Sequence, residues 1–177
     1  MLEERLPVRL DPVRLAETGR TLRGHLQLAD LSRLAESLVD AEGPVAVELA
    51  FGIDPVGVRY MQGRIEAQVR LICQRCMEPM EYRLEANLNV GLVSDEAQAE
   101  LLPESYEPML IGHEPLFLQD IVEDELILSL PIVPRHDPDR CPATRVLEQA
   151  TGGEEEDVEE GEVENPFAVL AKLKHDT

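Results

Sequence analysis

The stretch Val45-Ala-Val-Glu-Leu-Ala-Phe-Gly-Ile53 decides the fold, because its apolar side chains fall on every second position. The same alternation returns in Met80-Glu-Tyr-Arg-Leu-Glu-Ala-Asn-Leu-Asn-Val-Gly-Leu92. A period of two residues is typical of strands that bury one face of a sheet. The segment between them, residues 58–72, also alternates, and the turn Asp54-Pro-Val-Gly57 leads into it. We therefore expect three antiparallel strands between residues 45 and 93.

The middle strand changes parity at Gly63. Val58 and Tyr60 occupy even positions, whereas the apolar residues from Ile65 to Leu71 occupy odd ones. A change of parity inside one strand predicts a β-bulge, and a bulge at Gly63 would bend the strand. We therefore expect an α+β fold with a mainly antiparallel, curled sheet that forms a partial barrel.

A few helices are expected to cover this sheet. A helix over residues 118–130, ended by Pro131, is predicted by an apolar face formed by Leu118, Ile121, Val122, Leu126 and Leu130. Earlier in the chain, the pattern predicts short strands over residues 6–10 and 22–28. A helix over residues 31–39 should follow them, with Asp30 as its N-cap.

The chain carries a large excess of acid. Its 177 residues include 36 Asp and Glu against 16 Lys and Arg, a net charge of −20. Such a chain repels nucleic-acid phosphates on average and attracts basic partners. Aromatic residues make up only 3% and Trp is absent, so the core must be aliphatic. No apolar run approaches the roughly 18 residues that span a bilayer, and no secretory pattern opens the chain, so we expect a cytoplasmic protein.

Three cysteines give the best local indication of chemistry. Cys73-Gln-Arg-Cys76 occupies the expected hairpin tip, and Cys141 follows His136 in a proline-rich loop. Three thiolates and one imidazole suit tetrahedral Zn²⁺, so Cys73, Cys76, His136 and Cys141 are candidate ligands of one structural zinc site. Two alternatives stay open: reduced thiols without metal, and a pair that cycles between dithiol and disulfide. The hairpin tip favours a structural knuckle, because a redox pair normally opens a helix after a strand.

Basic residues cluster before and within the hairpin tip. Residues 59–76 hold four arginines against Glu66 alone, a local balance of +3. Such a patch suits RNA phosphates, so the candidate RNA-binding residues are Arg59, Arg64, Arg70 and Arg75. The alternative is that these arginines are ordinary solvated surface. Residues 94–130 hold ten acids and no Lys or Arg, which suits a basic protein partner.

The C-terminal part of the chain differs in composition from the rest. We expect a single domain over residues 1–150, a disordered acidic linker over 151–164 and a short docking helix over 165–177. Eight of the eleven residues from Glu154 to Glu164 are acidic. Such a segment has too few apolar groups to bury a core and fold. Beyond them Asn165-Pro166 is typical of a helix start. The candidate docking residues are Asn165, Pro166, Phe167, Leu170 and Leu173.

Together these motifs resemble the YceD family of bacterial large ribosomal RNA subunit accumulation proteins. The resemblance spans nearly the whole chain in order: Leu10-Asp-Pro-Val-Arg14, Cys73-Gln-Arg-Cys76, Glu104-Ser-Tyr-Glu-Pro108, Val122-Glu-Asp-Glu-Leu-Ile-Leu-Ser-Leu-Pro131, Val133-Pro-Arg-His136 with Cys141, and Asn165-Pro-Phe-Ala-Val-Leu170. It implies a role in the synthesis, processing or stability of large-subunit (23S) rRNA. No catalytic residues come with it.

Three functions are compatible with these observations. The preferred hypothesis is a non-enzymatic ribosome biogenesis factor that binds large-subunit rRNA, the pre-ribosome or a basic ribosomal protein. The alternatives are an acidic chaperone for a basic ribosomal protein and a Cys-x-x-Cys thiol or zinc module. No Gly-rich phosphate loop or catalytic motif favours an enzyme or a small-molecule substrate.

Overall fold

The computed structural model describes residues 5–112 and 116–144 of the chain. The chain divides into two compact units, residues 1–137 and 138–177. The first unit holds every strand of the described residues. The described part of the second unit is a 3₁₀ turn, η2 (Pro138–Arg140), followed by residues 141–144.

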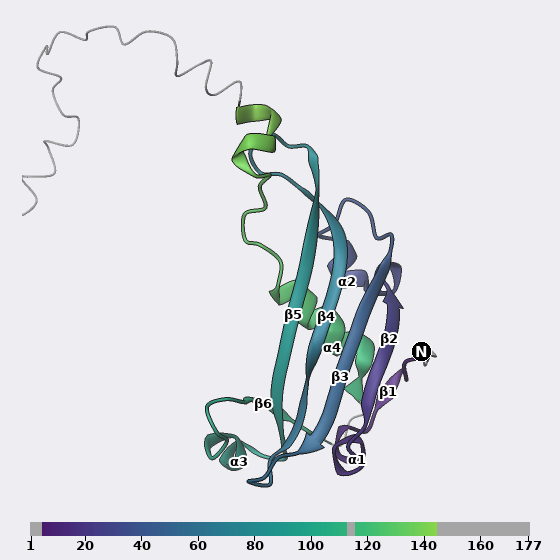
Figure 1. Ribbon diagram of the computed structural model, residues 1–177, viewed down its shortest axis with the longest axis vertical. Helices are drawn as coiled ribbons and strands as arrows, with labels where there is room; N and C mark the ends of the chain where they lie inside the picture. Colours follow the sequence, from purple (N-terminus) through teal and green to yellow (C-terminus); the bar gives the residue numbers. More distant parts are fainter. Residues whose placement is uncertain (1–4, 113–115, 145–177) are drawn as a thin grey trace, which may run out of the picture. The chain divides into compact units, whose positions relative to one another are not determined.

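A five-stranded sheet forms the centre of the first unit (Figure 1). Its strands lie in the order β2 (Thr21–Gln27), β3 (Pro44–Ile53), β4 (Arg59–Ile72), β5 (Pro79–Val93) and β6 (Glu107–Leu110). β3, β4 and β5 are antiparallel neighbours, as the alternating pattern predicts, and β2 pairs with β3 as a further antiparallel strand. β6 was not predicted, because four residues are too few to show an alternation; it pairs with β5 in parallel.

The sheet is open, so the α+β prediction is confirmed but the partial barrel is not. β2 and β6 are its two edges, and neither pairs with the other. The predicted bulge at Gly63 is also wrong. Gly63 pairs in continuous register with Leu49 on one side and Leu88 on the other. Met61, not Tyr60, is the buried residue before it, so the odd positions face the core throughout β4.

Gly63 is needed for close approach of the backbone rather than for a bend. A Cβ atom at this position would lie 2.0 Å from the backbone oxygen of Glu48 on β3. No side chain fits at that separation, so glycine allows β3 and β4 to stay paired here.

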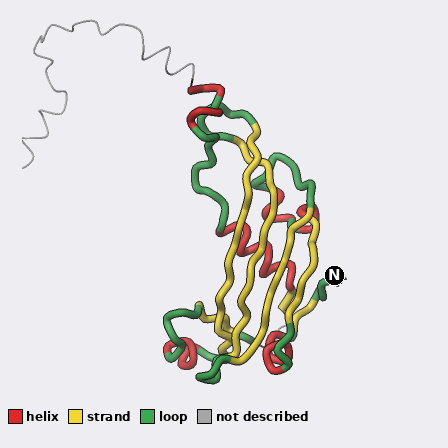
Figure 2. Tube along the Cα trace, in the orientation of Figure 1, coloured by secondary structure: helices red, strands yellow, loops and turns green. Residues whose placement is uncertain are grey.

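Short helices and a small second sheet complete the first unit, and Figure 2 shows them beside the strands. β1 (Arg9–Leu10) pairs with β7 (Leu116–Phe117), and α1 (Pro12–Glu17) follows β1. η1 (Leu28–Asp30) and α2 (Ser32–Ala35) connect β2 to β3, and α3 (Glu96–Glu100) connects β5 to β6. α4 (Leu118–Leu128) contacts β4 and β5, which confirms the predicted covering helix.

The core between the sheet and α4 is aliphatic, as the composition predicts. It includes Val45, Leu49, Met61, Ile65 and Leu84 from the sheet, and Leu118, Val122 and Leu126 from α4. Within the described residues no helix is both long enough and apolar enough to cross a membrane.

α2 is shorter than the predicted helix, and Asp30 is not its cap. Asp30 ends η1, and the N-cap position of α2 is Leu31, whose side chain makes no capping bond. Glu123 of α4 takes that role: its Oε1 accepts hydrogen bonds from the backbone N–H of Arg33 at 2.7 Å and of Leu34 at 3.1 Å. Its Oε2 accepts from Arg33 Nε at 2.8 Å. The cap is therefore supplied across the fold, which local sequence cannot reveal.

Glu123 is the one buried charged side chain among the described residues, with 4% of its surface exposed. We predict that Glu123→Ala lowers the free energy of unfolding by about 2–3 kcal/mol, because it leaves two backbone N–H groups and a guanidinium without their acceptor. Chemical denaturation of both proteins would measure the loss.

The matched control is Asp124→Ala. Asp124 binds the same arginine at 2.7 Å, but its side chain is 58% exposed. Its removal should cost less than about 1 kcal/mol. Equal losses for the two variants would contradict a capping role for Glu123.

Candidate metal centre

The hairpin between β4 and β5 carries the Cys-x-x-Cys pair in a tight turn. The backbone N–H of Cys73 donates to the Glu78 oxygen at 3.0 Å, and that of Met77 donates to the Cys73 oxygen at 2.9 Å. Met77 has a φ of 62°, the only positive φ of a described residue other than glycine. A left-handed residue reverses the chain within this short turn. Both cysteines consequently lie on one tight bend.

The loop after α4 is hydrogen-bonded to this turn. The backbone N–H of Gln74 donates to the Pro134 oxygen at 2.8 Å. His136 makes two contacts: its backbone N–H lies 3.4 Å from Cys73 Sγ, and its Nδ1 lies 3.4 Å from Cys76 Sγ. The sequence predicted the side chains of this cluster but not the bond between Gln74 and Pro134. Backbone contacts of this kind leave no mark in residue type.

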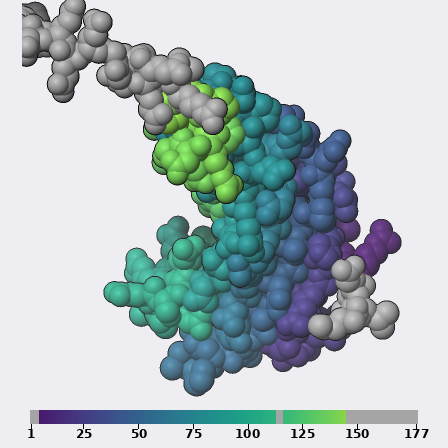
Figure 3. Space-filling model, turned by 45° about the horizontal axis from the view of Figure 1, so that its top comes forward, coloured from purple at the N-terminus to yellow at the C-terminus, as the bar shows by residue number. Residues whose placement is uncertain are grey.

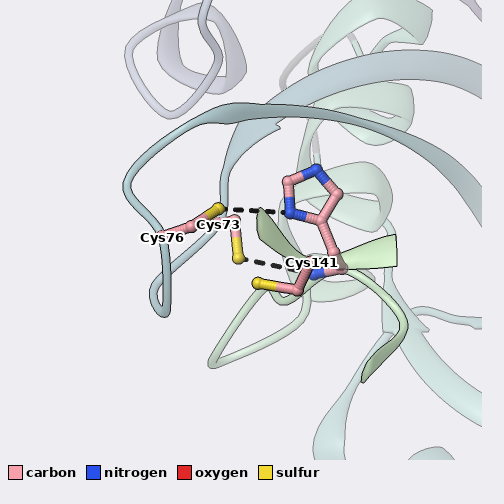
Figure 4. Close-up of side chains that lie close together, drawn as sticks. Cys73, Cys76 and Cys141 are labelled. Carbon is pink, nitrogen blue, oxygen red and sulfur yellow. Dashed lines mark hydrogen bonds between the residues drawn. The ribbon is translucent and has the colours of Figure 1, made fainter. Parts of the chain in front are cut away.

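The structure brings the four predicted metal ligands together (Figure 4). The ligand atoms of Cys73, Cys76, His136 and Cys141 all lie within 4.8 Å of one another. Cys141 follows His136 by only five residues, and the turn η2 lies between them. The backbone N–H of Cys141 donates to the Pro138 oxygen at 3.4 Å and closes this turn. None of these three cysteines, all within the described residues, forms a disulfide.

The donor set fits zinc. Four ligands around tetrahedral Zn²⁺ with Zn–S distances of about 2.3 Å lie about 3.8 Å apart. The 3.4 Å between Cys76 Sγ and His136 Nδ1 is close to that value. Since no separation exceeds 4.8 Å, no pair would have to close by more than about 1 Å, which rotation of a cysteine side chain can supply. Four protein ligands leave no open position, so a metal here would be structural rather than catalytic.

The environment of Cys73 favours its thiolate. Burial opposes ionisation, but hydrogen bonds from the backbone of Cys76, His136 and Arg75 and from the Cys76 side chain outweigh it. Together they lower the pKa of Cys73 from 9.0 to about 5. The thiolate is the form that binds metal. The backbone of the turn therefore prepares one ligand before any ion arrives.

The predicted RNA-binding arginines do not form an unpaired patch. Arg59 lies 3.6 Å from Glu17, and Arg70 lies 2.7 Å from Asp40. Arg64 lies 2.6 Å from Glu66 and 2.7 Å from Glu85. Arg75 is half-buried in the cysteine turn. An RNA phosphate would have to compete with these carboxylates, and RNA binding by the four arginines stays a prediction.

The solvent-facing side of the sheet is a ladder of alternating charges. Glu66 and Glu85 each bind both Arg64 and Arg83 on the neighbouring strands, at 2.6–2.7 Å. The hydrogen bond from Arg83, stronger than the opposing burial, lowers the pKa of Glu66. Cross-strand pairs of opposite charge stabilise the register of a sheet. The arginines of this face therefore stabilise the pairing of β4 with β5.

The predicted docking residues Asn165, Pro166, Phe167, Leu170 and Leu173 lie outside the described residues.

Comparison with known proteins places these features in a family context. The sequence model of "Large ribosomal RNA subunit accumulation protein YceD" matches residues 61–174. A protein of that name from Haemophilus influenzae is 38% identical over 175 residues, covering 98% of this chain and 99% of its own. No solved structure shows a significant match.

We predict that the purified protein contains about one Zn²⁺ per chain and that Cys76→Ser and His136→Ala each abolish it. Elemental analysis of the native protein measures the metal. His25→Ala is the matched control, because His25 lies on β2 and is not part of the cluster. Metal content that survives Cys76→Ser would contradict the site, as would thiols equally reactive with and without chelator.

A second prediction concerns the metal-free protein. Because the pKa of Cys73 is lower in the folded chain, its ionisation stabilises the fold fully above about pH 9.0, and this contribution is lost as the pH falls to about 5. The difference in Tm between chelated wild type and Cys73→Ser should therefore narrow over that range. A difference that does not change with pH would show that the thiolate is not favoured.

Proposed function

Because this chain belongs to the YceD family, we propose that it is a non-enzymatic factor in the accumulation of large-subunit (23S) rRNA, acting in its synthesis, processing or stability. The observation that carries the proposal is the identity of 38% with an accumulation protein over 98% of the chain. A match of that extent includes the hairpin, the covering helix and the loop of the candidate metal centre. The proposal therefore applies to the whole chain rather than to one motif.

The described charges support binding rather than catalysis. Glu123, the one buried charged side chain among the described residues, is fully used as a helix cap. Glu66 and Glu85 on the sheet face are each bound to two arginines. A catalytic acid or base must exchange a proton with a substrate, whereas these carboxylates are already held by arginines and backbone N–H groups. We therefore assign these acids to stability.

We propose that Zn²⁺ bound by Cys73, Cys76, His136 and Cys141 ties the loop after α4 to the tip of the hairpin. Metal binding of this kind adds directly to folding stability. The residues of the turn, Arg75 among them, would then keep one conformation for a partner. Partners of this surface would be large-subunit rRNA, the pre-ribosome or a basic ribosomal protein.

Residues 165–177 are proposed as a separate docking segment for such a partner. The net charge of −20 makes the chain attractive to basic ribosomal proteins. The acidic linker at residues 151–164 would bind such a basic protein through its charge, and the docking residues would add apolar contacts.

We predict that cells lacking this protein have a lower ratio of large- to small-subunit rRNA than their parents, and that the wild-type gene restores it. Quantification of both rRNAs measures the effect.

A chain without residues 165–177 should keep the wild-type Tm but fail to restore the ratio, because it lacks the docking segment. An unchanged ratio in the deletion strain would contradict the proposed function. Crosslinking to ribosomal proteins without rRNA would favour the acidic chaperone instead.

A further inference from the structure

Three arginines line a surface cleft near the N-terminus. The cleft has a volume of about 600 Å³, and Arg9, Arg14 and Arg20 surround it together with Asp11. They come from three different elements: Arg9 from β1, Arg14 from α1, and Arg20 from the turn before β2. The three residues are exposed. This N-terminal region is purple in Figure 3. A cleft of this size is in the range of ligand-binding sites.

The backbone around these arginines is firmly held. The Asp11 side chain caps α1 by accepting from the backbone N–H of Arg14 at 3.1 Å. Gly19, with a φ of 58°, turns the chain, and the backbone N–H of Arg20 then donates to the Leu15 oxygen at 3.1 Å. The arginines therefore project from fixed positions, which reduces the entropy lost when they bind a ligand.

The arginines of the cleft differ from those of the sheet in their ion pairing. Several other arginines form ion pairs with carboxylates, among them Arg23, Arg33, Arg59, Arg64, Arg70 and Arg83. No carboxylate of the described residues pairs with the guanidinium of Arg9, Arg14 or Arg20. Glu17, the acid of α1, is directed to Arg59. The three arginines and Asp11 leave the cleft with a charge of about +2 in a strongly acidic chain.

Arg9 has a second feature that limits the choice of ligand. Its guanidinium carbon lies 5.6 Å from the centre of the Phe117 ring, a cation–π contact. Unpaired RNA bases stack on planar guanidinium groups, and guanidinium groups bind phosphate oxygens with two hydrogen bonds. An acidic peptide would use the charge but not the stacking surface.

We propose that this cleft binds the phosphate backbone of single-stranded RNA, with Arg9 also stacking on a base. The inference rests on the proposed function, for which it supplies a direct rRNA contact separate from the hairpin tip. The overall negative charge does not prevent binding, because salt screens charges beyond about 8 Å at physiological ionic strength. RNA would therefore meet the local field of the three arginines.

The test compares two full-length variants with equal changes of charge. One is Arg9→Gln/Arg14→Gln/Arg20→Gln in the cleft; the control is Arg23→Gln/Gln62→Glu/Arg83→Gln on the sheet face, which lowers the charge by the same three units and keeps the four candidate RNA-binding arginines of the hairpin. The probe is an in vitro transcript of the large-subunit rRNA, titrated at several salt concentrations. Circular dichroism and Tm show that both variants are folded.

The cleft variant should bind more weakly, with a plot of log affinity against log salt shallower by about 2, since each phosphate contact with single-stranded RNA contributes about 0.7 to the slope. The control should keep the wild-type slope. An unchanged slope for the cleft variant would overturn the inference, and so would equal losses in both variants, which would mean that only net charge matters. Polyglutamate that competes as well as RNA would identify an acidic-peptide site and also overturn it.

The same variants separate this inference from the proposed function. If the cleft variant restores rRNA accumulation in cells as well as wild type does, the cleft inference fails and the function stands. If cells without the protein accumulate normal rRNA, the proposed function fails whatever the transcript binds.

Discussion

The pairing of β4 with β5 is the interaction on which the rest of the structure depends. It runs without interruption from Tyr60–Gly91 to Ile72–Pro79. Because side chains alternate along both strands, one face of the pair supplies the aliphatic core under α4 and the other carries the charged ladder. The far end of the same pair holds the cysteine turn. A slip of one residue would disrupt all three at once.

The charged residues of this chain are paired differently on different surfaces. On the sheet face, acids and arginines neutralise one another across strands. Glu123 is buried because it replaces a missing helix cap. In contrast, no carboxylate of the described residues pairs with the arginines of the N-terminal cleft, Arg9, Arg14 and Arg20. A net charge of −20 therefore does not describe what a partner would meet at each surface.

The candidate metal centre lies at the end of the long β4–β5 hairpin that α4 does not cover. β4 and β5 have 14 and 15 residues, longer than the 11-residue α4 that covers them. Their far end therefore needs another source of order. The loop of Pro134 and His136 reaches this end through hydrogen bonds to the turn. A metal ion bound there would add four bonds at this end of the hairpin.

The sequence by itself determined the strands, the covering helix and the ligand types. Periodicity of two between residues 45 and 93 and of 3.6 in α4 is a local property, so it is visible without coordinates. Four candidate metal ligands in a Cys-x-x-Cys and His–Cys arrangement could be selected because few residue types bind zinc.

Tertiary structure decided the features that depend on residues far apart in the chain. Sequence parity placed a bulge at Gly63, but the structure requires glycine there because the backbone of Glu48 lies too close for a Cβ. Asp30 had the right residue type for a cap, yet Glu123, some 90 residues away, provides it. The hairpin arginines were judged by their neighbours in sequence, whereas acids from other parts of the fold bind three of them: Glu17 binds Arg59, Asp40 binds Arg70 and Glu85 binds Arg64. The fold brings Arg9, Arg14 and Arg20 to one cleft, because β1, α1 and the turn before β2 lie around it. Residue type and period are local, but pairing partners and burial are set by the fold.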